Sequence, residues 1–458
     1  MGVSFDLQQH RSGRVFTNEI CASRELNDMK KVVFITDVRF WRCRTGAQQR
    51  INSLVHHLNN AGCKVTIAFT APLDDENQPV GSEEMKGICD RSLIDESELN
   101  VISLIDDWSP TGVIEKIKWK SKCILNAMSP VDRTTSSKST TASLETLRTP
   151  EFIPRAKDLL ERLTPDVVIV EYVTLAYLLP PKTDRNYLAV LDSHDLLSDR
   201  YRQFRAAGYT HWLEISEEEE FAAFQHFDSV LAIQRHEAKT IRDRIADVDV
   251  VVCGHPVAAR NEGNQDCDIG PESKFTVGEL GQECPSYVVG YFASDNPANR
   301  DALRWLLDSI WPIVMDQNSD IRLVLAGSVC QGLEAEQLPT AVNVLGSVDQ
   351  VSDFYNQVDT VLNPIRFGTG LKIKNLEVLQ FELPLISTGH GVEAMQNSGN
   401  ESAPWIIADT ATKFATAIIR LARSVEERKT MIENGKALAK QLTPDIVYGE
   451  LMRYIEEH

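Results

Sequence analysis

The sequence predicts an α/β protein with two domains, each built on a sheet of parallel strands. Short apolar runs recur along the chain and alternate with stretches of helical periodicity, which is typical of a parallel sheet covered on both faces. At 458 residues the chain is too long for one compact core. A polar stretch rich in Gly, Asn, Asp and Glu separates two groups of apolar runs, so we expect a linker there.

Composition narrows the functional classes. The formal charge is −19, which argues against general nucleic-acid binding because a phosphate backbone needs a basic face. The sequence holds no apolar run of about 18 residues, the length that a membrane-spanning helix needs. Its nine cysteines are scattered without a Cys-x-x-Cys pair, which favours free thiols in a cytoplasmic protein over disulfides or a zinc site. We find no metal-binding cluster in the sequence.

The first predicted domain covers residues 31–258 and follows a leader of residues 1–30. Lys31–Thr36 and Lys64–Thr70 are predicted buried strands, and the helix between them completes a βαβ unit. Glu98–Leu104 is a further candidate strand. The remaining candidate strands are apolar runs of similar length, at Asp166–Glu171, Tyr187–Asp192, Asp228–Ile233 and Val248–Cys253. The glutamate run Glu217–Glu220 is interpreted as a solvated helix face.

Arginine and aromatic residues meet in the loop after the first strand. Arg39, Arg42 and Arg44 surround Phe40 and Trp41, and Arg50 follows on the helix. One interpretation is a solvated basic loop. The other is a lip that contacts an acceptor or a phosphate, since arginine and aromatic side chains suit such groups. The sequence leaves both open.

A predicted linker at residues 259–286 leads to a second α/β domain at residues 287–442. Its candidate strands include Tyr287–Phe292, Ile321–Ala326 and Asn343–Leu345. A helical pattern from Ala415 to Leu438, with a break near Gly435, closes this domain. A last helix, Asp445–Glu457, follows Pro444 and lies in a terminal segment at residues 443–458 that we expect to cross back to the first domain.

The most informative stretch joins a strand at Asp359–Asn363 to a helix. Between them, Gly368 and Gly370 form a turn that lets a ligand approach the main chain closely. The free N–H groups of such a junction and the helix dipole favour an anion. Lys372 and Lys374 add cationic donors, and Glu377 adds an acceptor for hydroxyl groups. The alternative is a plain glycine turn beside solvated lysines.

This stretch resembles the donor-site signature of the group 1 (family 4) glycosyltransferases, which have the GT-B fold. The shared pattern is Gly-x-Gly-x-Lys-x-Lys-x-x-Glu at residues 368–377, followed by Pro384–Thr388 and by Gly389-His390-Gly391-Val392-Glu393. The resemblance implies two Rossmann-like domains facing each other across a cleft. The wider family has a second glutamate eight residues before Glu377, where this chain has Thr369.

The resemblance also implies roles for individual residues. Catalytic roles fall on His194, Lys372 and Glu377, although a lone histidine after a strand is as often structural. Acceptor contacts fall on Arg44, Thr45, Gly46 and Asp195. Donor contacts fall on the glycine-rich stretch and on positions near three strand ends, namely Gly290, Arg300, Gly346, Val348, Arg366, Gly368, Thr369, Gly370, Leu371 and Lys374.

The implied activity is transfer of a sugar from a UDP- or GDP-sugar to a glycan, lipid-linked or small-molecule acceptor, with retention of configuration and without a metal or cofactor. The rival interpretations are a sugar-nucleotide epimerase or a phosphorylase on the same fold, and a nucleotide-sugar or glycan-binding protein without turnover. Residues 111–128 form a basic amphipathic pattern, which fits a core-packed helix or peripheral contact with an anionic membrane.

Overall fold

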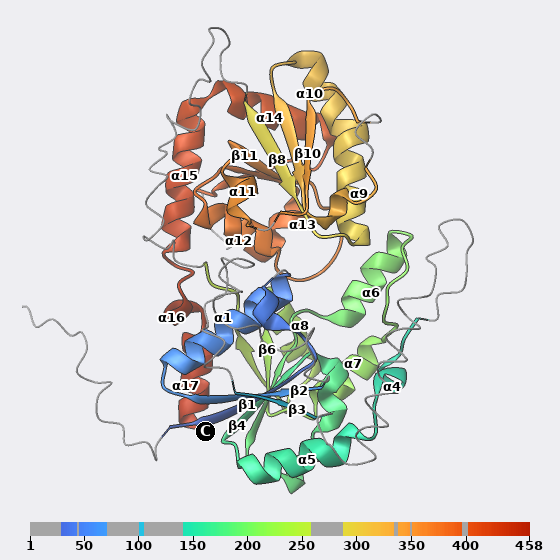
Figure 1. The fold of residues 1–458 in the computed structure, drawn as a ribbon, viewed down its shortest axis with the longest axis vertical. Coiled ribbons are helices and arrows are strands. Elements are labelled where there is room, and N and C mark those ends of the chain that lie inside the picture. The colour runs from blue at the N-terminus through green and yellow to red at the C-terminus, as the bar shows by residue number, and fades with distance from the viewer. Residues whose placement is uncertain are drawn as a thin grey trace, which may run out of the picture.

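The computed structural model describes residues 29–43, 45–70, 100–104, 141–257, 287–333, 338–348, 350–395 and 402–458. Two parallel sheets, each with helices on both faces, form two domains that lie one above the other in Figure 1. The predicted two-domain α/β class is therefore confirmed. The predicted linker, the basic pattern at 111–128, Arg44 and all of the proposed leader except residues 29 and 30 lie outside the described residues.

The first domain is built on seven strands in the order β3-β2-β1-β4-β5-β6-β7, and every described pairing is parallel. This order reverses direction beside β1, and ligands of open parallel sheets bind at the carboxyl ends of the strands near such a point. The strands are β1 (Lys31–Thr36), β2 (Lys64–Phe69), β3 (Asn100–Ser103), β4 (Val167–Glu171), β5 (Leu188–Asp192), β6 (Ser229–Ala232) and β7 (Asp249–Val252).

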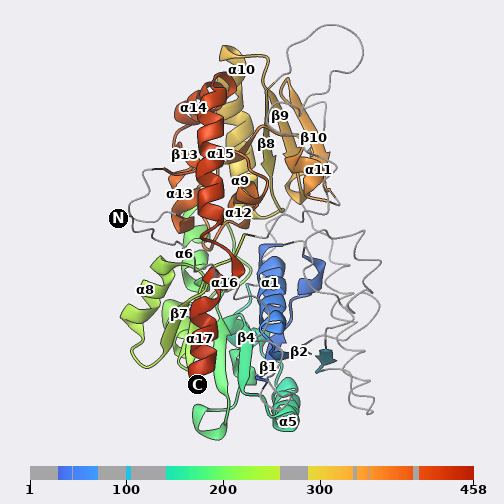
Figure 2. The ribbon, with the colours of Figure 1, turned by 90° about the vertical axis from the view of Figure 1, so that its left-hand side faces the viewer.

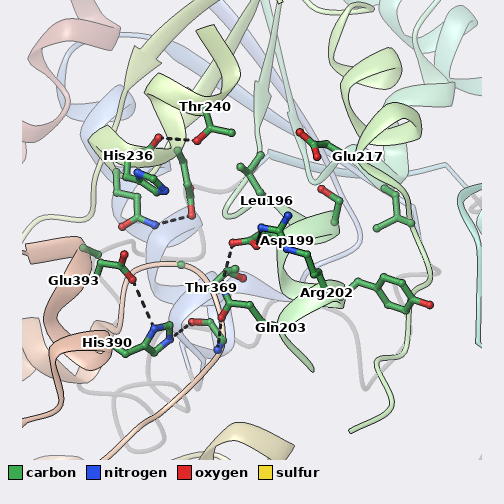
Figure 3. A pocket seen from close by; sticks show the side chains of 18 of the residues that line it. Leu196, Asp199, Arg202, Gln203, Glu217, His236, Thr240, Thr369, His390 and Glu393 are labelled. Atoms are coloured by element: carbon green, nitrogen blue, oxygen red, sulfur yellow. Dashed lines mark hydrogen bonds and ion pairs between the residues drawn. The ribbon is translucent and has the colours of Figure 1, made fainter. Parts of the chain in front are cut away.

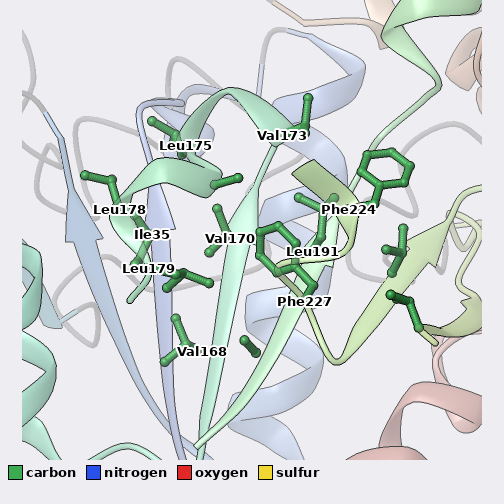
Figure 4. Packing of buried hydrophobic residues seen from close by; sticks show 14 of the residues in the cluster. Ile35, Val168, Val170, Val173, Leu175, Leu178, Leu179, Leu191, Phe224 and Phe227 are labelled. Carbon is green, nitrogen blue, oxygen red and sulfur yellow. The ribbon is translucent and has the colours of Figure 1, made fainter. Parts of the chain in front are cut away.

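Alternate residues of these strands enter the two apolar layers that hold the domain together. Val168 and Val170 of β4 point to one face, where Phe224 and Phe227 cover them (Figure 4). Val167 and Ile169 belong to the cluster on the other face, with the helix that follows β1. Strands buried on both faces are continuous apolar runs, which explains why the sequence shows them clearly.

Helices cover both faces of the first sheet. They are α1 (Gly46–Asn60), α4 (Leu144–Leu147), α5 (Phe152–Leu163), α6 (Leu197–Ala206), α7 (Glu217–Phe224) and α8 (Arg235–Arg244). In α7 the prediction of a solvated glutamate face is wrong for Glu220, which is fully buried. Its carboxylate accepts from the Leu197 and Ser198 N–H groups at the start of α6, so it caps that helix.

The second domain is built on six parallel strands in the order β10-β9-β8-β11-β12-β13. Its core again lies on both faces of the sheet. The strands are β8 (Val288–Phe292), β9 (Arg322–Ala326), β10 (Val342–Gly346), β11 (Thr360–Asn363), β12 (Leu385–Ser387) and β13 (Trp405–Ile407). The helices around it are α9 (Pro297–Trp305), α10 (Trp311–Gln317), α11 (Ser352–Tyr355), α12 (Ile373–Gln380), α13 (Gly389–Val392), α14 (Ala411–Arg423) and α15 (Val425–Ala439).

The break predicted near Gly435 falls elsewhere. Ser424 separates α14 from α15, and its side chain accepts from the Glu427 N–H to cap α15. Gly435 lies inside α15, where a Cβ would come within 3.4 Å of the Leu379 side chain. That glycine therefore serves close packing between two helices rather than termination.

The chain ends against the first domain. From α15 it runs through α16 (Pro444–Val447) to α17 (Gly449–Glu457), which lies beside the first sheet (Figure 2). Tyr448, between these two helices, is fully buried and its hydroxyl donates to Ser53 Oγ at 2.9 Å. Tyr454 donates to Asp249 of β7. None of the described helices is long and apolar enough to cross a membrane.

Candidate active site

A pocket of about 820 Å³ opens between the two domains, at the carboxyl ends of both sets of strands. Parallel sheets collect ligands at this end because the loops there combine side chains from many strands. The first domain contributes Thr45, Gly46, Gln49, Tyr172, His194, Asp195 and Arg200, and the second contributes Ser294, Asn299, Val348, Glu377 and all of residues 368–374. The glycine-and-lysine stretch therefore lines a cleft shared by both domains.

The turn at Gly368 and Gly370 has the geometry that the two glycines allow. Their φ angles are +103° and +76°, in the left-handed region that side chains disfavour. The Gly368 N–H donates to Gln203 Oε1 of α6 at 2.8 Å, and a Cβ on Gly370 would lie 3.4 Å from the Asp195 side chain. The turn thus belongs to the second domain but rests on the first.

Lys372 holds this turn in shape. Its Nζ donates to the carbonyl oxygens of Gly368, Thr369 and Gly370 at 2.8–2.9 Å. An ammonium group has three protons, so these bonds use all of them. Burial, with Arg200 nearby, lowers the pKa of Lys372 to about 8. Direct contact of Lys372 with a diphosphate would require these bonds to exchange.

Lys374 is better placed than Lys372 to contact a ligand in the cleft. Its Nζ lies 3.3 Å from Asn299 Oδ1 and 4.8 Å from the centre of the Tyr291 ring. Burial and the neighbouring Lys372 lower its pKa to about 7. Two helical residues spaced by two would diverge, but Lys372 precedes α12 in an extended conformation, and both side chains line the pocket.

Glu377 joins the domains across the cleft. Its Oε2 accepts from the Tyr355 hydroxyl at 2.6 Å, and its Oε1 accepts from Gln49 Nε2 of α1 at 3.2 Å. At the same contact, a Cβ on Gly46 would lie 2.7 Å from Ile373 Cγ1. A side chain at residue 46 would have to displace Ile373, so glycine favours the close approach of α1 to α12.

His194 stands at the end of β5 in a strained conformation. Its φ angle is +60°, which is unusual for a residue with a side chain. The ring stacks on Tyr172 with 4.1 Å between centroids, and Nε2 lies 2.6 Å from Glu171 Oε2. Burial, then Asp192, raises the pKa of Glu171 to about 7. The environment therefore orients the imidazole toward the pocket that it lines.

Asp192, beside this pair, carries a buried ion pair. Arg50 Nε lies 2.8 Å from Asp192 Oδ2 and Arg50 Nη2 lies 2.8 Å from Oδ1, with both side chains almost completely buried. Burial acts to lower the pKa of Arg50, but Asp192 outweighs it and the net shift is upward. Glu171, Asp192 and His194 come close enough to surround a metal ion. The fixed guanidinium holds the Asp192 oxygens, however, so we assign no metal site to them.

Asp195 connects the first domain to the glycine turn. Its Oδ2 accepts from the Thr369 hydroxyl at 2.7 Å and lies 3.3 Å from Arg200 Nη1. Its Oδ1 is buried and has no partner among the described residues, although Asp195 lines the pocket. A buried acceptor without a partner is costly, so this oxygen is suited to a ligand hydroxyl.

The structure places four predicted donor contacts outside the pocket. Gly290 is inside β8, where a Cβ would come within 2.6 Å of the Phe354 and Val358 side chains, so helix packing explains it. Arg300 is exposed and pairs with Asp295. Arg366 pairs with Asp301 through two hydrogen bonds and lies over the Trp305 ring. Gly346 adjoins the pocket through the next residues, Ser347 and Val348.

The arginine-rich loop of the first domain divides between the core and the pocket. Arg44 lies outside the described residues, so the interpretation of this loop as an acceptor lip stays a prediction. Phe40 and Trp41 are fully buried in the core, and Arg50 is buried with Asp192. Thr45 and Gly46 do line the pocket, as does Leu371 in the second domain. Sequence reasoning missed Gln203, Glu171 and Asn299. Glu171 ends a strand that the sequence predicts, and that strand lies beside the one that precedes His194. This order of strands was the available indication that Glu171 lies near His194.

Comparison with known proteins agrees with this arrangement. Solved structures with similar folds include a sucrose-phosphate synthase from Thermosynechococcus elongatus (13% identity, 93% of this chain and 98% of that one, TM-score 0.60). TarM from S. aureus, in a complex with Fondaparinux, alpha-GlcNAc-glycerol and UDP, has 10% identity over 93% of this chain and all of that one, with a TM-score of 0.63. The pneumococcal O-GlcNAc transferase GtfA has 11% identity, coverage of 94% and 99%, and a TM-score of 0.57. At these identities the likeness shows the fold, which is GT-B.

Within this fold, residues 286–424 match the family described as "Glycosyl transferases group 1". A curated relative, "Uncharacterized 44.6 kDa protein in cps region" of Klebsiella pneumoniae, is 27% identical over 148 residues, which are 30% of this chain and 37% of that protein's length. The second domain is thus a group 1 glycosyltransferase domain in a GT-B protein. The resemblance to group 1 glycosyltransferases that the glycine-and-lysine stretch indicated is confirmed.

Proposed function

We propose that the chain transfers a sugar from a UDP- or GDP-sugar to a hydroxyl group of a glycan, lipid-linked or small-molecule acceptor. The proposal includes retention of configuration, which is taken from the group 1 resemblance, and a reaction without a metal or cofactor. In place of a metal ion, the buried lysine and the N–H groups of the glycine turn would meet the charge of the leaving diphosphate.

One observation carries the proposal: the glycine turn and Lys374 line the same cleft as His194 and Asp195 of the opposite domain. A pocket of about 820 Å³ falls in the range of sites that enclose a small ligand. Group transfer needs one wall that binds the diphosphate and an opposite wall that orients the hydroxyl groups. The charged donors of the second domain and the polar side chains of the first domain suit these two tasks. A domain that only bound a nucleotide would not need the opposite wall.

In the proposed mechanism the second domain holds the donor. Lys374 and the N–H groups of Thr369 and Gly370 would stabilise the diphosphate as charge develops on it when the sugar–oxygen bond breaks. Glu377 would accept hydrogen bonds from ribose or sugar hydroxyls. On the opposite wall, His194 and the free Oδ1 of Asp195 would orient hydroxyls of the transferred sugar. The contacts between Thr369 and Asp195 and between Gln49 and Glu377 close the cleft against water.

The ligands of the structural neighbours support this donor class. TarM and GtfA were solved with UDP, and the HepE protein of Anabaena with UDP and glucose. The name of the Klebsiella relative places it in a cps region, which supports a role in polysaccharide formation. The proposed membrane contact rests on residues 111–128, outside the described part of the chain.

A thermal-shift panel tests the proposal most directly. UDP, GDP and ADP and their sugar conjugates are added in turn, and a bound ligand raises the unfolding temperature by mass action. We expect a UDP or GDP compound to give the largest shift, and incubation with that donor and glycan acceptors to give a glycoside. The absence of any nucleotide shift would contradict the proposal.

The same incubation without acceptor tests a second candidate, epimerisation. Epimerisation is favoured by a fold match to a "putative UDP-N-acetylglucosamine 2-epimerase" from Listeria monocytogenes. The match has 9% identity, covers 94% of this chain and 96% of that one, and has a TM-score of 0.50. An isomeric donor detected by NMR would identify an epimerase. Donor binding without either product would identify a binding protein.

Donor affinity should depend on pH through Lys374. Burial lowers its pKa from 10.5 to about 7, so the ammonium form that attracts a diphosphate is lost as the pH rises through 7. We expect the affinity for the UDP-sugar to fall by up to about tenfold per pH unit above 7. Titration calorimetry at pH 6.5 and 9 measures the affinity. The ligand is a nucleotide sugar, because its diphosphate has no second ionisation in this range. Lys374→Arg, which stays charged, should make the donor affinity nearly independent of pH. Equal affinities of the unmodified chain at both pH values would disprove the predicted pH dependence.

A further inference from the structure

A second pocket, of about 590 Å³, shares the glycine turn with the donor cleft. Helices α6, α7 and α8 of the first domain form most of its walls, and His390 and Glu393 close it from the second domain (Figure 3). Gly368, Thr369, Gly370 and Lys372 line both pockets. The second pocket therefore adjoins the donor cleft at these residues.

The charges of this pocket are balanced within its own lining. Arg202 pairs with Asp199 at 2.5 Å, and Arg244 pairs with Glu217 at 2.8 Å. Lys372 is held by the turn carbonyls. With the arginines paired and Glu393 facing the pocket, the lining does not favour a phosphate or another anion. Its remaining polar groups, such as the amides of Gln203 and Gln234 and the hydroxyl of Thr240, are neutral.

Glu237 differs from these groups because one of its carboxyl oxygens has no partner among the described residues. Its side chain lines the pocket and is 4% exposed, and its Oε1 accepts from Gln234 Nε2 at 2.7 Å. Its Oε2 is buried and has no partner among the described residues. Burial, then Asp195, raises the pKa of this carboxyl to about 8, so it is mainly protonated at neutral pH and able to donate as well as accept. A buried polar atom without a partner is expensive, which points to a ligand group that completes it.

We propose that this second pocket binds the acceptor as a neutral, hydroxyl-rich saccharide, with the Oε2 of Glu237 hydrogen-bonded to one of its hydroxyl groups. The proposal rests on the proposed transferase function and adds the class of acceptor and its place. The sequence placed the acceptor near Thr45 and Gly46, on the α1 side of the cleft. The α8 side instead offers a pocket that already contains an unsatisfied polar group and reaches the turn that lines the donor cleft.

Saccharide binding tests the proposal with the full chain. The probes are the methyl glycosides of glucose, galactose, mannose and N-acetylglucosamine, with glucose 6-phosphate as the anionic comparison. Saturation-transfer NMR in the presence of excess UDP detects weak binding while the nucleotide occupies the donor cleft. We expect at least one neutral glycoside to bind and the phosphate to bind more weakly.

Three variants locate that binding. Glu237→Ala should weaken glycoside binding roughly tenfold, the cost of one buried hydrogen bond, whereas Glu237→Gln, which keeps both a donor and an acceptor, should stay within about threefold at pH 7. Thr240→Leu should abolish binding by filling the pocket. Asp243→Asn is the matched control, because it changes an exposed carboxylate of the same helix, paired with Lys239 outside the pocket.

The outcomes separate this proposal from the proposed function. A glycoside signal that falls in Glu237→Ala and Thr240→Leu but not in Asp243→Asn supports the pocket. A signal that no variant changes, stronger binding of the phosphate, or no glycoside signal at all overturns it. UDP binding by the same samples, followed by calorimetry, reports the donor site independently. Normal nucleotide binding without glycoside binding therefore refutes only the acceptor pocket, whereas an unmodified chain that binds neither UDP nor GDP refutes the transferase.

Discussion

Lys374→Ala should lower the rate of sugar transfer by about 10²–10³, the usual cost of removing one preorganised hydrogen-bond donor from a transition-state site. Lys374 is buried, lines the donor cleft, and has Asn299 and the Tyr291 ring as its described contacts. In the proposed reaction its charge would meet the negative charge that develops on the diphosphate. Initial rates with the donor chosen by the thermal-shift panel, together with UDP affinity, measure the effect.

Two control variants make this result specific. Lys413→Ala removes an exposed lysine of α14 and should leave the rate unchanged. Lys372→Ala removes the three hydrogen bonds that hold the turn, so it should lower the unfolding temperature as well as the rate. A Lys374→Ala protein that transfers sugar at the normal rate would show that the turn and Lys372 hold the diphosphate without Lys374.

The fold was predictable because its strands are buried on both faces. β1 begins and ends where the apolar run Lys31–Thr36 does, and β5 loses only its first predicted residue, Tyr187. The short edge strand β13 was missed, since Trp405–Ile407 has only three residues and no clear pattern. The break at Ser424 was misplaced because a capping serine looks like any other polar residue, whereas Gly435 looks like a helix end.

The site was predictable where its residues are contiguous. The turn, Lys374 and Glu377 follow one another, and their spacing alone puts them on one strand-to-helix junction. Partners from distant segments could not be predicted. Nothing near Arg366 in the sequence shows that Asp301 binds its guanidinium, and nothing near Lys372 shows that its ammonium turns back to the carbonyls. Pairing of charges across the fold depends on topology, which one sequence does not reveal.

Arg50→Met should destabilise the protein by about 3–5 kcal/mol, because it leaves Asp192 buried without its counter-charge. Both side chains are at most 1% exposed, and Arg50 also donates to the Gly254 carbonyl. Urea unfolding followed by circular dichroism measures the loss. Arg162→Met, which breaks the exposed pair with Asp158, is the matched control and should cost less than about 1 kcal/mol.

The double variant Arg50→Met with Asp192→Leu decides between two explanations of that loss. If an unpaired buried carboxylate causes it, removing both charges should restore much of the stability, since apolar side chains of similar volume can replace a buried ion pair. The double variant should nevertheless transfer sugar slowly. Asp192 and Arg50 both act on the charge of Glu171, and Glu171 is the hydrogen-bond partner of the His194 imidazole. If the double variant is no more stable than Arg50→Met, the packing of the arginine stem, rather than its charge, holds α1 against the first sheet.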